Sequence, residues 1–449
     1  MGKKIAFIGA GSLGFTRGLV NDILTYSAFE DCTLALMDIN PERLEFAKQA
    51  VTKLVESSGL PVTVQATTNR AEALEGAHGV ICTILSGGID IWRNDIEIPK
   101  RYGVDTCVGD TRGPSGIFRF LRTAPVMLDI CADIAKYADP NVVFLNYSNP
   151  MAMLCRIMQG EFPKMCITGL CHSVQGTLGQ MAKWIDADPA DVTATCAGIN
   201  HTAFYIDFKY KGQDAYPLLR KAVAENPDIY NNEQVRMELF LALDYFITES
   251  SGHNSEYCAW FRKRPDLIEK YCTHGTGWNP GKYAFVLEEY LKREDTWKAD
   301  TEAYLNGEIA VKPRGHEYAA YIFNAVFGDH EMFTFNGNVR NFGIISNLPQ
   351  GACVEVPCLA DANGVTPMQV GAMPGHLALM CNTSSQIEEL AVEAALTGNP
   401  KLVYQAICFD PLTSAVLGLR EIKDMVNDMF DASRDYLPQF AKPEGKFLS

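Results

Sequence analysis

Near the start of the chain, three glycines follow an apolar segment at a fixed spacing. The residues KKIAFIG form a short buried-type strand pattern, and Gly9, Gly11 and Gly14 in IGAGSLG have G-x-G-x-x-G spacing just before a segment with helical periodicity. In this pattern the first glycine makes a tight turn, the second lets a pyrophosphate approach the backbone, and the third allows close packing of helix on strand. The pyrophosphate lies at the positive helix end. The motif therefore predicts a dinucleotide site.

A second strand pattern, CTLALMDI, supplies the acid that such a site needs. Asp38 lies 24 residues after Gly14, close to the roughly 20 residues expected before the carboxylate that binds a ribose diol. The charge of Asp38 would repel a 2′-phosphate, which favours NAD over NADP. A glycine triplet alone is common in strand-to-helix turns, but here the strand, the helix and the acid occur together.

The first half of the chain alternates between strand and helix patterns. One helix begins at Pro41 and ends near Gly59, and another is expected over VMLDICADIAKYA, residues 126–138. The apolar segments VTVQATT, GVICTIL and VVFLNYS are typical of strands between such helices. This alternation predicts an α/β fold in which residues 1–195 form a Rossmann-type, doubly wound parallel sheet that binds NAD.

From about residue 196 the pattern changes. TAFYIDFKYKG alternates like a half-exposed strand, long helical segments follow, and a strand-rich piece precedes terminal helices around 376–435. Because 449 residues are too many for one compact core, we expect residues 196–449 to form a mixed α+β domain for substrate binding and oligomerisation. Its long, apolar-rich helices indicate a homo-oligomer, a dimer or a tetramer.

Charge and cysteine usage exclude several classes of protein. A net charge of −15 argues against a nucleic-acid partner, which needs a basic face. No apolar run approaches the length of a membrane span, and MGKKIAFIGAG leaves no room for a signal peptide, so no membrane partner is expected. The 14 cysteines are scattered singly, unlike those of a secreted disulfide scaffold. We therefore expect a cytoplasmic protein.

Polar residues follow further strands of the predicted sheet. Asn149 lies in LNYSNPMAM, Cys171 and His172 lie in GLCHSVQG, and Asn200 and His201 lie in CAGINHTAF. Open α/β sheets bind ligands at the carboxyl ends of their strands. A thiolate favoured by a helix N-terminus and an imidazole can hold one ion there, with open positions for substrate oxygens. A cysteine and a histidine 30 residues apart are more often core residues, and the polar neighbours make the two interpretations about equal.

Several segments together resemble a known family. These segments are GDTRGPSG, LNYSNPMAM, GLCHSVQG, CAGINHTAFY, TESSGHNSEYCAWF, NVRN, NLPQG and CVEVPCLADANG. They resemble motifs of glycoside hydrolase family 4 and occur in the same order as in that family. The resemblance extends over nearly the whole chain. Within the family the chain is similar to the α-galactosidase (melibiase) branch. The form CHSV is typical of α-galactosidases, and α-galacturonidases resemble it.

This resemblance implies a redox mechanism in place of displacement by two carboxylates. NAD takes hydride from carbon 3 of the sugar, and a divalent metal, usually Mn²⁺, binds the oxygens on carbons 2 and 3. A base then removes the proton on carbon 2, the aglycone leaves by elimination, water adds, and NADH reduces the ketone. The implied activity is hydrolysis of small-molecule α-galactosides.

The resemblance also implies roles for particular residues. By motif position, Cys171 and His201 are the metal ligands, and Asn149 and Asn200 bind sugar hydroxyls.

The proton-transfer residues are less uniform within the family. His172 stands where phospho-glycosidase relatives carry an aspartate acid, so the identity of the acid stays open, and Asp110 in GDT is a second candidate. The base in relatives is a tyrosine, and Tyr257 is its expected counterpart, with Glu249 and His253 in the same segment. A phenol with a pKa of about 10 needs a nearby cation to act as a base. The alternative to a catalytic role is that Asp110 only stabilises a turn in a glycine-rich loop. For Tyr257 the alternative is that its amphipathic ring only packs beside Trp260 and Phe261.

Other activities share parts of these patterns. An α-galacturonidase of the same family would need a cation against the substrate carboxylate, for which Arg112, Arg119 and Arg340 are candidates. An NAD-dependent 2-hydroxy-acid dehydrogenase shares the first-domain pattern and an Asn-Pro after a strand, but it would use a His-Asp relay and no thiol ligand. A non-enzymatic NAD sensor would not need the polar residues at one sheet edge.

Overall fold

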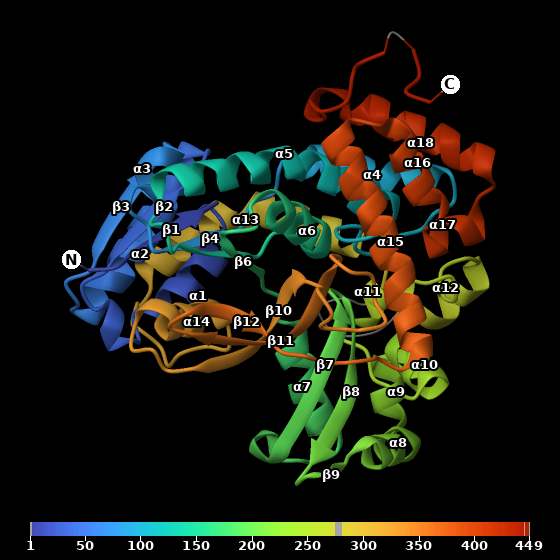
Figure 1. Cartoon of the computed structure of the whole chain (residues 1–449), viewed down its shortest axis with the longest axis horizontal. Coiled ribbons are helices and arrows are strands. Elements are labelled where there is room, and N and C mark those ends of the chain that lie inside the picture. Colours follow the sequence, from blue (N-terminus) through green and yellow to red (C-terminus); the bar gives the residue numbers. More distant parts are fainter. Residues whose placement is uncertain (1, 274–280, 444, 449) are drawn as a thin grey trace.

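The computed structural model describes residues 2–273, 281–443 and 445–448. These residues form one sheet in the strand order β3-β2-β1-β4-β5-β6-β10-β11-β7-β8-β9, with β12 paired to β11 (Figure 1). The first six strands are parallel, namely β1 (Lys4–Ile8), β2 (Thr33–Met37), β3 (Thr63–Thr67), β4 (Gly79–Cys82), β5 (Val143–Asn146) and β6 (Cys166–Gly169). This parallel 3-2-1-4-5-6 order confirms the predicted doubly wound fold.

Helices connect these strands. They are α1 (Leu13–Ile23), α2 (Pro41–Ser58), α3 (Arg70–Leu74), α4 (Gly88–Arg101), α5 (Gly113–Tyr137), α6 (Met151–Glu161) and α7 (Ser173–Trp184). The predicted limits of α2 are confirmed, and local chemistry explains them. The Asn40 side chain accepts hydrogen bonds from the amides of Glu42 and Arg43, and the helix ends at Gly59, whose φ of 69° is left-handed.

The second half adds antiparallel strands and more helices. The strands are β7 (Val192–Ile199), β8 (Thr202–Tyr210), β9 (Gln213–Asp214), β10 (Phe333–Arg340), β11 (Cys353–Asp361) and β12 (Gly364–Pro367). The helices are α8 (Tyr216–Glu225), α9 (Pro227–Asn232), α10 (Gln234–Leu243), α11 (Ser251–Glu256), α12 (Pro265–Tyr271), α13 (Phe285–Asn306), α14 (Tyr318–Phe327), α15 (Gly375–Thr397), α16 (Pro400–Cys408), α17 (Pro411–Val416) and α18 (Leu419–Ser433). No helix in the described ranges is long and apolar enough to cross a membrane.

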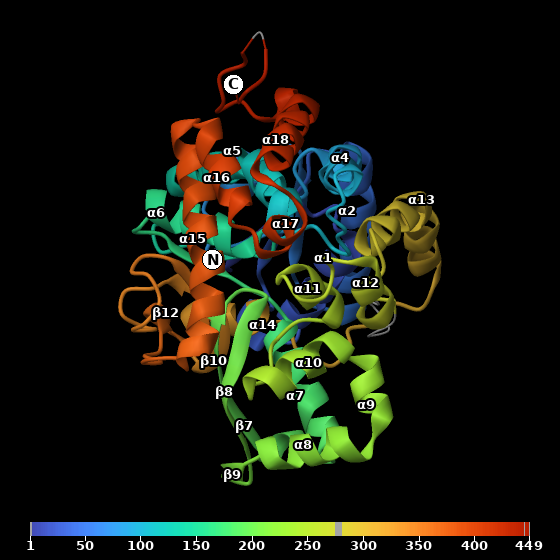
Figure 2. The ribbon, with the colours of Figure 1, turned by 90° about the vertical axis from the view of Figure 1, so that its right-hand side faces the viewer.

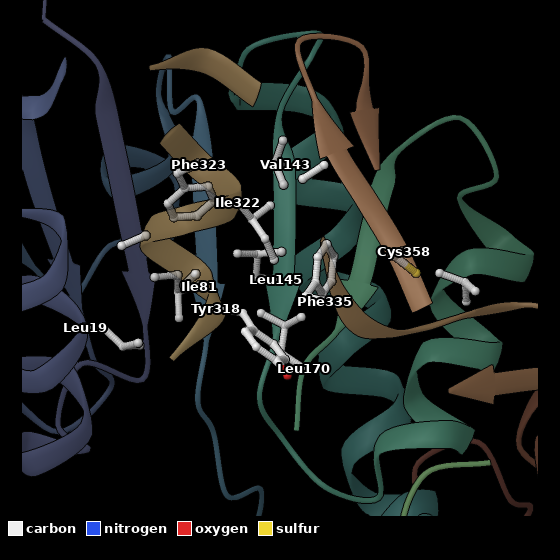
Figure 3. Close-up of a cluster of buried hydrophobic side chains, with 14 of the residues drawn as sticks. Leu19, Ile81, Val143, Leu145, Leu170, Tyr318, Ile322, Phe323, Phe335 and Cys358 are labelled. Atoms are coloured by element: carbon white, nitrogen blue, oxygen red, sulfur yellow. The ribbon is translucent and has the colours of Figure 1, made fainter. Parts of the chain in front are cut away.

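The two faces of the parallel sheet carry separate hydrophobic cores. Along β1, Ile5 and Phe7 belong to one core and Ala6 and Ile8 to the other, because side chains alternate along a strand. The first core packs against α1, α2 and α14, as the ring of Phe323 beside the strands shows (Figure 3). The second packs against α3, α5 and the C-terminal helices, which return to the first half of the chain (Figure 2).

Helix α5 is longer than the sequence pattern indicates. The expectation began at residue 126, but the helix starts at Gly113 and runs through Pro125. A proline inside a helix leaves the carbonyl four residues earlier without its amide partner. Here the Leu121 carbonyl accepts a hydrogen bond of 2.8 Å from the Gln439 side chain instead. A tertiary contact therefore permits the extra turns that carry the helix back to the candidate site.

The two halves share the sheet. Strand β10 pairs antiparallel with β6 through Asn338 and Gly169, and β11 pairs with β7 through Glu355 and Gly198. The expected boundary at residue 195 falls inside β7, and the division of the chain into domains there stays a prediction. These pairings bring the β7–β8 turn to the carboxyl ends of β5 and β6.

Candidate active site

The glycine turn after β1 has the conformation that a dinucleotide site requires. Gly9 has a φ of 88°, and a Cβ placed on it would lie 2.5 Å from the Thr83 carbonyl oxygen. The Gly11 amide donates a hydrogen bond of 2.7 Å to Asp38 Oδ2, and a Cβ on Gly11 would lie 2.6 Å from the same oxygen. The predicted glycines and the predicted acid therefore form one local unit.

The third glycine is not explained by close packing. Among the described residues, the atom nearest to a Cβ on Gly14 would be Arg17 Nη2, as far away as 3.9 Å, so the expected close contact between helix and strand is absent at this position. Ser12 at the N-cap of α1 makes no side-chain capping bond, and no acidic residue lies in the first turn. The positive end of α1 is thus available to an anion such as a pyrophosphate.

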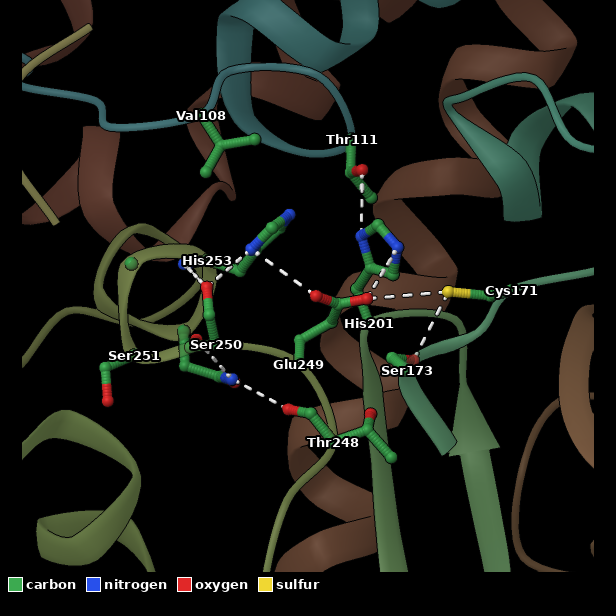
Figure 4. Close-up of polar contacts among 12 residues, drawn as sticks. Val108, Thr111, Cys171, Ser173, His201, Thr248, Glu249, Ser250, Ser251 and His253 are labelled. Atoms are coloured by element: carbon green, nitrogen blue, oxygen red, sulfur yellow. Dashed lines mark hydrogen bonds and ion pairs between the residues drawn. The ribbon is translucent and has the colours of Figure 1, made fainter. Parts of the chain in front are cut away.

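Three potential metal ligands converge from separate parts of the chain (Figure 4). Cys171 follows β6, His201 lies in the β7–β8 turn, and Glu249 lies just before α11. Glu249 Oε1 is 3.2 Å from His201 Nε2 and 3.4 Å from Cys171 Sγ, and the three donor atoms lie within 4.8 Å of one another. The structure brings Cys171 and His201 together. It also adds the carboxylate of Glu249, which the sequence analysis named only as a residue in the same segment as Tyr257.

Two of these three residues have a backbone conformation that is unusual outside glycine. The φ angle is 64° at His201 and 66° at Glu249. Such a conformation costs about 1 to 3 kcal/mol per residue and persists where surrounding contacts enforce it. Both side chains are buried, with exposures of 3% and 8%. The fold thus directs an imidazole and a carboxylate toward each other at an energetic cost.

Hydrogen bonds determine which nitrogen of His201 is available to a cation. The Thr111 hydroxyl donates to Asp110 Oδ1 at 2.7 Å and lies 3.1 Å from His201 Nδ1. Because its single proton points to the carboxylate, this hydroxyl accepts from Nδ1–H. The unprotonated Nε2 is therefore the nitrogen that lies beside Glu249, which is the arrangement of a histidine ligand oriented by an outer partner.

Burial and neighbouring charges set the ionisation of the three donors. Burial lowers the pKa of His201 to about 4, so the imidazole is neutral at neutral pH. Burial opposes ionisation of Glu249, but the neighbouring imidazoles outweigh it, first of all His201, which is charged below about pH 4, and the pKa of Glu249 falls to about 2. Burial, reinforced by Glu249, raises the pKa of Cys171 well above its usual value. The expected thiolate at a helix N-terminus is therefore not favoured by the protein alone, and a cation must displace its proton.

Asp110 lies beside this cluster. Its Oδ2 accepts a hydrogen bond of 3.1 Å from Asn149 Nδ2, and its Oδ1 accepts from Thr111. Burial would raise the pKa of Asp110, but the positive charge of Arg119 and the nearby imidazoles lower it. An ionised Asp110 can accept a proton and has none to donate.

The loop that carries Asp110 is held by Glu256, which sequence reasoning did not single out. The Glu256 carboxylate accepts hydrogen bonds from the amides of Cys107, Val108 and Gly109 at 2.7, 3.0 and 2.9 Å. The only sequence signal was that the small polar run in TESSGHNSEY is flanked by two acids.

Tyr257 follows directly after Glu256 and is 6% exposed. Its hydroxyl lies 3.3 Å from His201 Nδ1. Burial and the nearby Asp110 raise the pKa of the phenol well above its usual value. The residue nominated as base is thus in the cluster, and without a cation it stays protonated.

His172 lies outside the buried cluster. Its side chain is 65% exposed, at the N-cap of α7, and its Nδ1 is 3.6 Å from Glu317 Oε1. The proton-donor role of His172 stays a prediction.

Asn200 belongs to a second buried polar group, where the sheet joins its two parts. Its Nδ2 lies 3.4 Å from Glu355 Oε2. Three buried oxygens have no hydrogen-bond partner among the described residues, namely Asn200 Oδ1, Glu355 Oε1 and Asn338 Oδ1. Burial raises the pKa of Glu355 to about 8, so this side chain is largely neutral at neutral pH. The proton of the neutral Glu355 can be donated to one of the amide oxygens. An acceptor that this proton does not reach indicates a missing donor, such as a substrate hydroxyl or water.

The arginines considered for a substrate carboxylate are all engaged by protein groups. Arg112 donates a hydrogen bond of 2.7 Å to the Asn200 carbonyl and forms an ion pair of 3.1 Å with Glu388. Arg119 donates to the Asn149 carbonyl at 3.3 Å, and its guanidinium lies 4.8 Å from the ring centre of Trp92. Arg340 donates to the Gly351 carbonyl.

Comparison with known proteins shows extensive similarity. The model described as Family 4 glycosyl hydrolase matches residues 4–187, and the model of the family's C-terminal domain matches residues 196–413. An α-galactosidase of Bacillus subtilis (strain 168) is 37% identical over 98% of this chain and 100% of its own length. An α-galactosidase of Rhizobium meliloti (strain 1021) is 36% identical over 98% and 90%. An α-galacturonidase of Lachnoclostridium phytofermentans is 28% identical over 97% of both chains.

Solved structures share the fold. The crystal structure of lplD from Bacillus subtilis has a TM-score of 0.83 and 26% identity, over 95% of this chain and 99% of that one. A 6-phospho-α-glucosidase from gut microorganisms, in complex with NAD and Mn²⁺, has a TM-score of 0.81 and 20% identity over 98% and 100%.

Proposed function

The chain belongs to family 4 of the glycosyl hydrolases, and on this premise we propose that it is an NAD- and divalent-metal-dependent α-galactosidase. One observation carries the proposal. Cys171, His201 and Glu249 converge on one point, at the same edge of the sheet as the glycine turn and Asp38. A hydride acceptor and a divalent cation can therefore be bound along the same carboxyl edge of the parallel sheet.

The residues present fit both groups. The turn at Gly9 and Gly11 and the uncapped start of α1 suit a pyrophosphate, and Asp38 suits a ribose diol. The Cys171 thiol and the His201 imidazole suit a divalent metal such as Mn²⁺. When bound, NAD supplies the hydride acceptor for carbon 3 of the sugar, and the cation polarises the oxygens on carbons 2 and 3.

The chain's own residues then have distinct tasks. Tyr257, 3.3 Å from His201, removes the proton from carbon 2, and the ionised Asp110 stands ready to accept a proton. The Asn149 and Asn200 side chains bind sugar hydroxyls, which would satisfy the orphaned Asn200 Oδ1. The exposed His172 donates a proton to the departing glycosidic oxygen, and its Nδ1 lies 3.6 Å from Glu317 Oε1.

The site favours a galactoside over a galacturonide. A substrate carboxylate needs a cation whose charge is not already balanced. Arg112 is paired with Glu388, and the positive charge of Arg119 acts on the ionised Asp110. Arg340 donates to the Gly351 carbonyl. The identity to the two α-galactosidases, 36 and 37%, also exceeds the 28% to the α-galacturonidase.

The test compares two substrates under the same conditions. The purified protein is given NAD, Mn²⁺ and a reductant, with p-nitrophenyl α-galactoside or the corresponding α-galacturonide. Turnover of the galactoside alone, lost on adding a chelator or omitting NAD, is expected. Activity that is indifferent to both NAD and chelator would contradict the mechanism, and turnover of the galacturonide alone would reassign the substrate.

Location and assembly are part of the same proposal. The cysteines of the described residues form no disulfide, which supports a reducing cytoplasm. Large exposed apolar side chains on the C-terminal helices, including Leu379 and Leu419, support a homo-oligomer, a dimer or a tetramer. Size-exclusion chromatography with light scattering tests the assembly.

A further inference from the structure

We propose that Glu249 is a third protein ligand of the catalytic cation, so that the centre is Cys171–His201–Glu249 and not a cysteine–histidine pair. This inference rests on the proposed function, because it concerns the same cation. It differs from the expectation drawn from the sequence, in which only a thiol and an imidazole hold the ion.

The distances among the three donors suit one ion. Ligand atoms bound at about 2.0 to 2.3 Å to a shared metal lie about 3 to 4 Å apart. Glu249 Oε1 lies 3.2 Å from His201 Nε2 and 3.4 Å from Cys171 Sγ. The Glu249 carboxylate oxygen therefore lies where it could bind the same ion as His201 Nε2 and Cys171 Sγ, and Figure 4 shows it facing both atoms.

The other carboxylate oxygen is oriented by separate contacts. Glu249 Oε2 lies 3.4 Å from His253 Nδ1, and that nitrogen lies 2.8 Å from the Ser250 hydroxyl. This support resembles the outer partners that orient metal ligands in proteins. The left-handed φ of 66° at Glu249 directs the side chain into the cluster despite its backbone cost.

The charge balance points the same way. Glu249 is 8% exposed, and within the described ranges its ion-pair partners are the two imidazoles of His201 and His253, with no lysine or arginine. A buried carboxylate without a permanent cation beside it is costly. A divalent cation would neutralise both this carboxylate and the Cys171 thiolate, and would keep open positions for two sugar oxygens.

A second donor set, Asp110, His201 and His253, also lies within 4.8 Å. It shares His201, and the hydrogen bonds decide between the two sets. Asp110 already accepts from Thr111 and Asn149, and His201 Nδ1 donates to Thr111. The nitrogen left for a metal, Nε2, lies beside Glu249.

The test measures binding of Mn²⁺ alone to the full chain, by the electron paramagnetic resonance of free Mn²⁺. The Glu249→Gln variant is expected to raise the Kd for Mn²⁺ at least about tenfold, with the Tm of the metal-free protein retained. Glu249→Asp, which keeps a carboxylate but withdraws it by one methylene, should give an intermediate Kd and serves if the glutamine variant does not fold. The matched control is Glu389→Gln, which removes a partly exposed ion pair with Arg156 and should leave the Kd unchanged.

Cobalt substitution separates this inference from the proposed function. The Co²⁺ form of the wild type should show a thiolate charge-transfer band, which remains in Glu249→Gln and disappears in Cys171→Ser. A wild-type Kd in Glu249→Gln, with a raised Kd in Cys171→Ser, overturns the glutamate ligand and leaves the proposed function standing. A Co²⁺ form without the thiolate band overturns Cys171 as a ligand, and with it the proposed Cys171–His201–Glu249 centre, while the activity assay still decides the proposed function.

Discussion

The hydroxyl of Tyr257 lies 3.3 Å from Nδ1 of His201, the imidazole whose Nε2 lies beside Glu249. The candidate base and the candidate metal centre therefore share one residue. A cation held at Nε2 would lie one imidazole ring from the phenol and would favour its ionised form. Proton abstraction and metal binding are thus expected to be coupled, whereas NAD binding depends on a different part of the sheet edge.

Tyr257→Phe is expected to remove proton abstraction without removing binding. The variant should keep its affinities for NAD and Mn²⁺, while kcat on p-nitrophenyl α-galactoside falls about 10²- to 10⁴-fold. Nuclear magnetic resonance in deuterated water should show that the sugar's carbon-2 proton no longer exchanges. Exchange at the wild-type rate would assign the base elsewhere, with Asp110 next in line.

Replacing Glu256 tests its role in holding the loop before α5. Glu256→Ala leaves the amides of Cys107, Val108 and Gly109 without their acceptor and should lower the free energy of unfolding by about 2 to 4 kcal/mol. Glu256→Gln keeps one acceptor oxygen and should lose less. Hydrogen exchange of these three amides should accelerate in the alanine variant, and unchanged protection would contradict the assignment.

Two glycines of the same motif should respond differently to alanine. Gly9→Ala places a Cβ 2.5 Å from a backbone oxygen at a φ of 88° and should destabilise the protein by about 1 to 3 kcal/mol. Gly14→Ala meets nothing closer than 3.9 Å and improves helix propensity, so its Tm should be kept or raised. Thermal unfolding of both variants checks this, and an equal loss of Tm would contradict it.

Glu355 should make stability depend on pH. Its pKa of about 8 lies above the usual 4.5, so between these values the native protein holds a proton that the unfolded chain has lost. The stability contributed by Glu355 is full below about pH 4.5 and falls as the pH rises toward about 8. The difference in unfolding free energy between wild type and Glu355→Gln should therefore fall by about 2 to 4 kcal/mol between about pH 5 and about pH 8.

Denaturant unfolding at several pH values measures this difference, because all other titrating groups are common to both proteins and cancel. Glu389→Gln, at a partly exposed ion pair, is the control and should show no such trend. A pH-independent difference for Glu355→Gln would mean that the carboxyl group is ionised in the native protein.

Local features of the chain could be predicted from the sequence because their causes act over a few residues. The limits of α2, the tight turn at Gly9 and the alternation of strands and helices follow from turn chemistry and periodicity. The contact between Gly11 and Asp38 follows as well, since β1 and β2 are neighbours in the parallel sheet. The family resemblance added Cys171 and His201, which local patterns alone left undecided.

Only the tertiary structure decided the composition of the site. Glu249 joins Cys171 across 78 residues, and Glu256 reaches the amide of Cys107 across 149 residues. Both contacts depend on how the β7–β8 turn and α11 pack against the parallel sheet, and no periodicity records that packing. The same holds for α5, whose passage through Pro125 depends on a hydrogen bond from Gln439. Sequence patterns report short-range backbone preferences, whereas the convergence of side chains on one point is set by long-range packing.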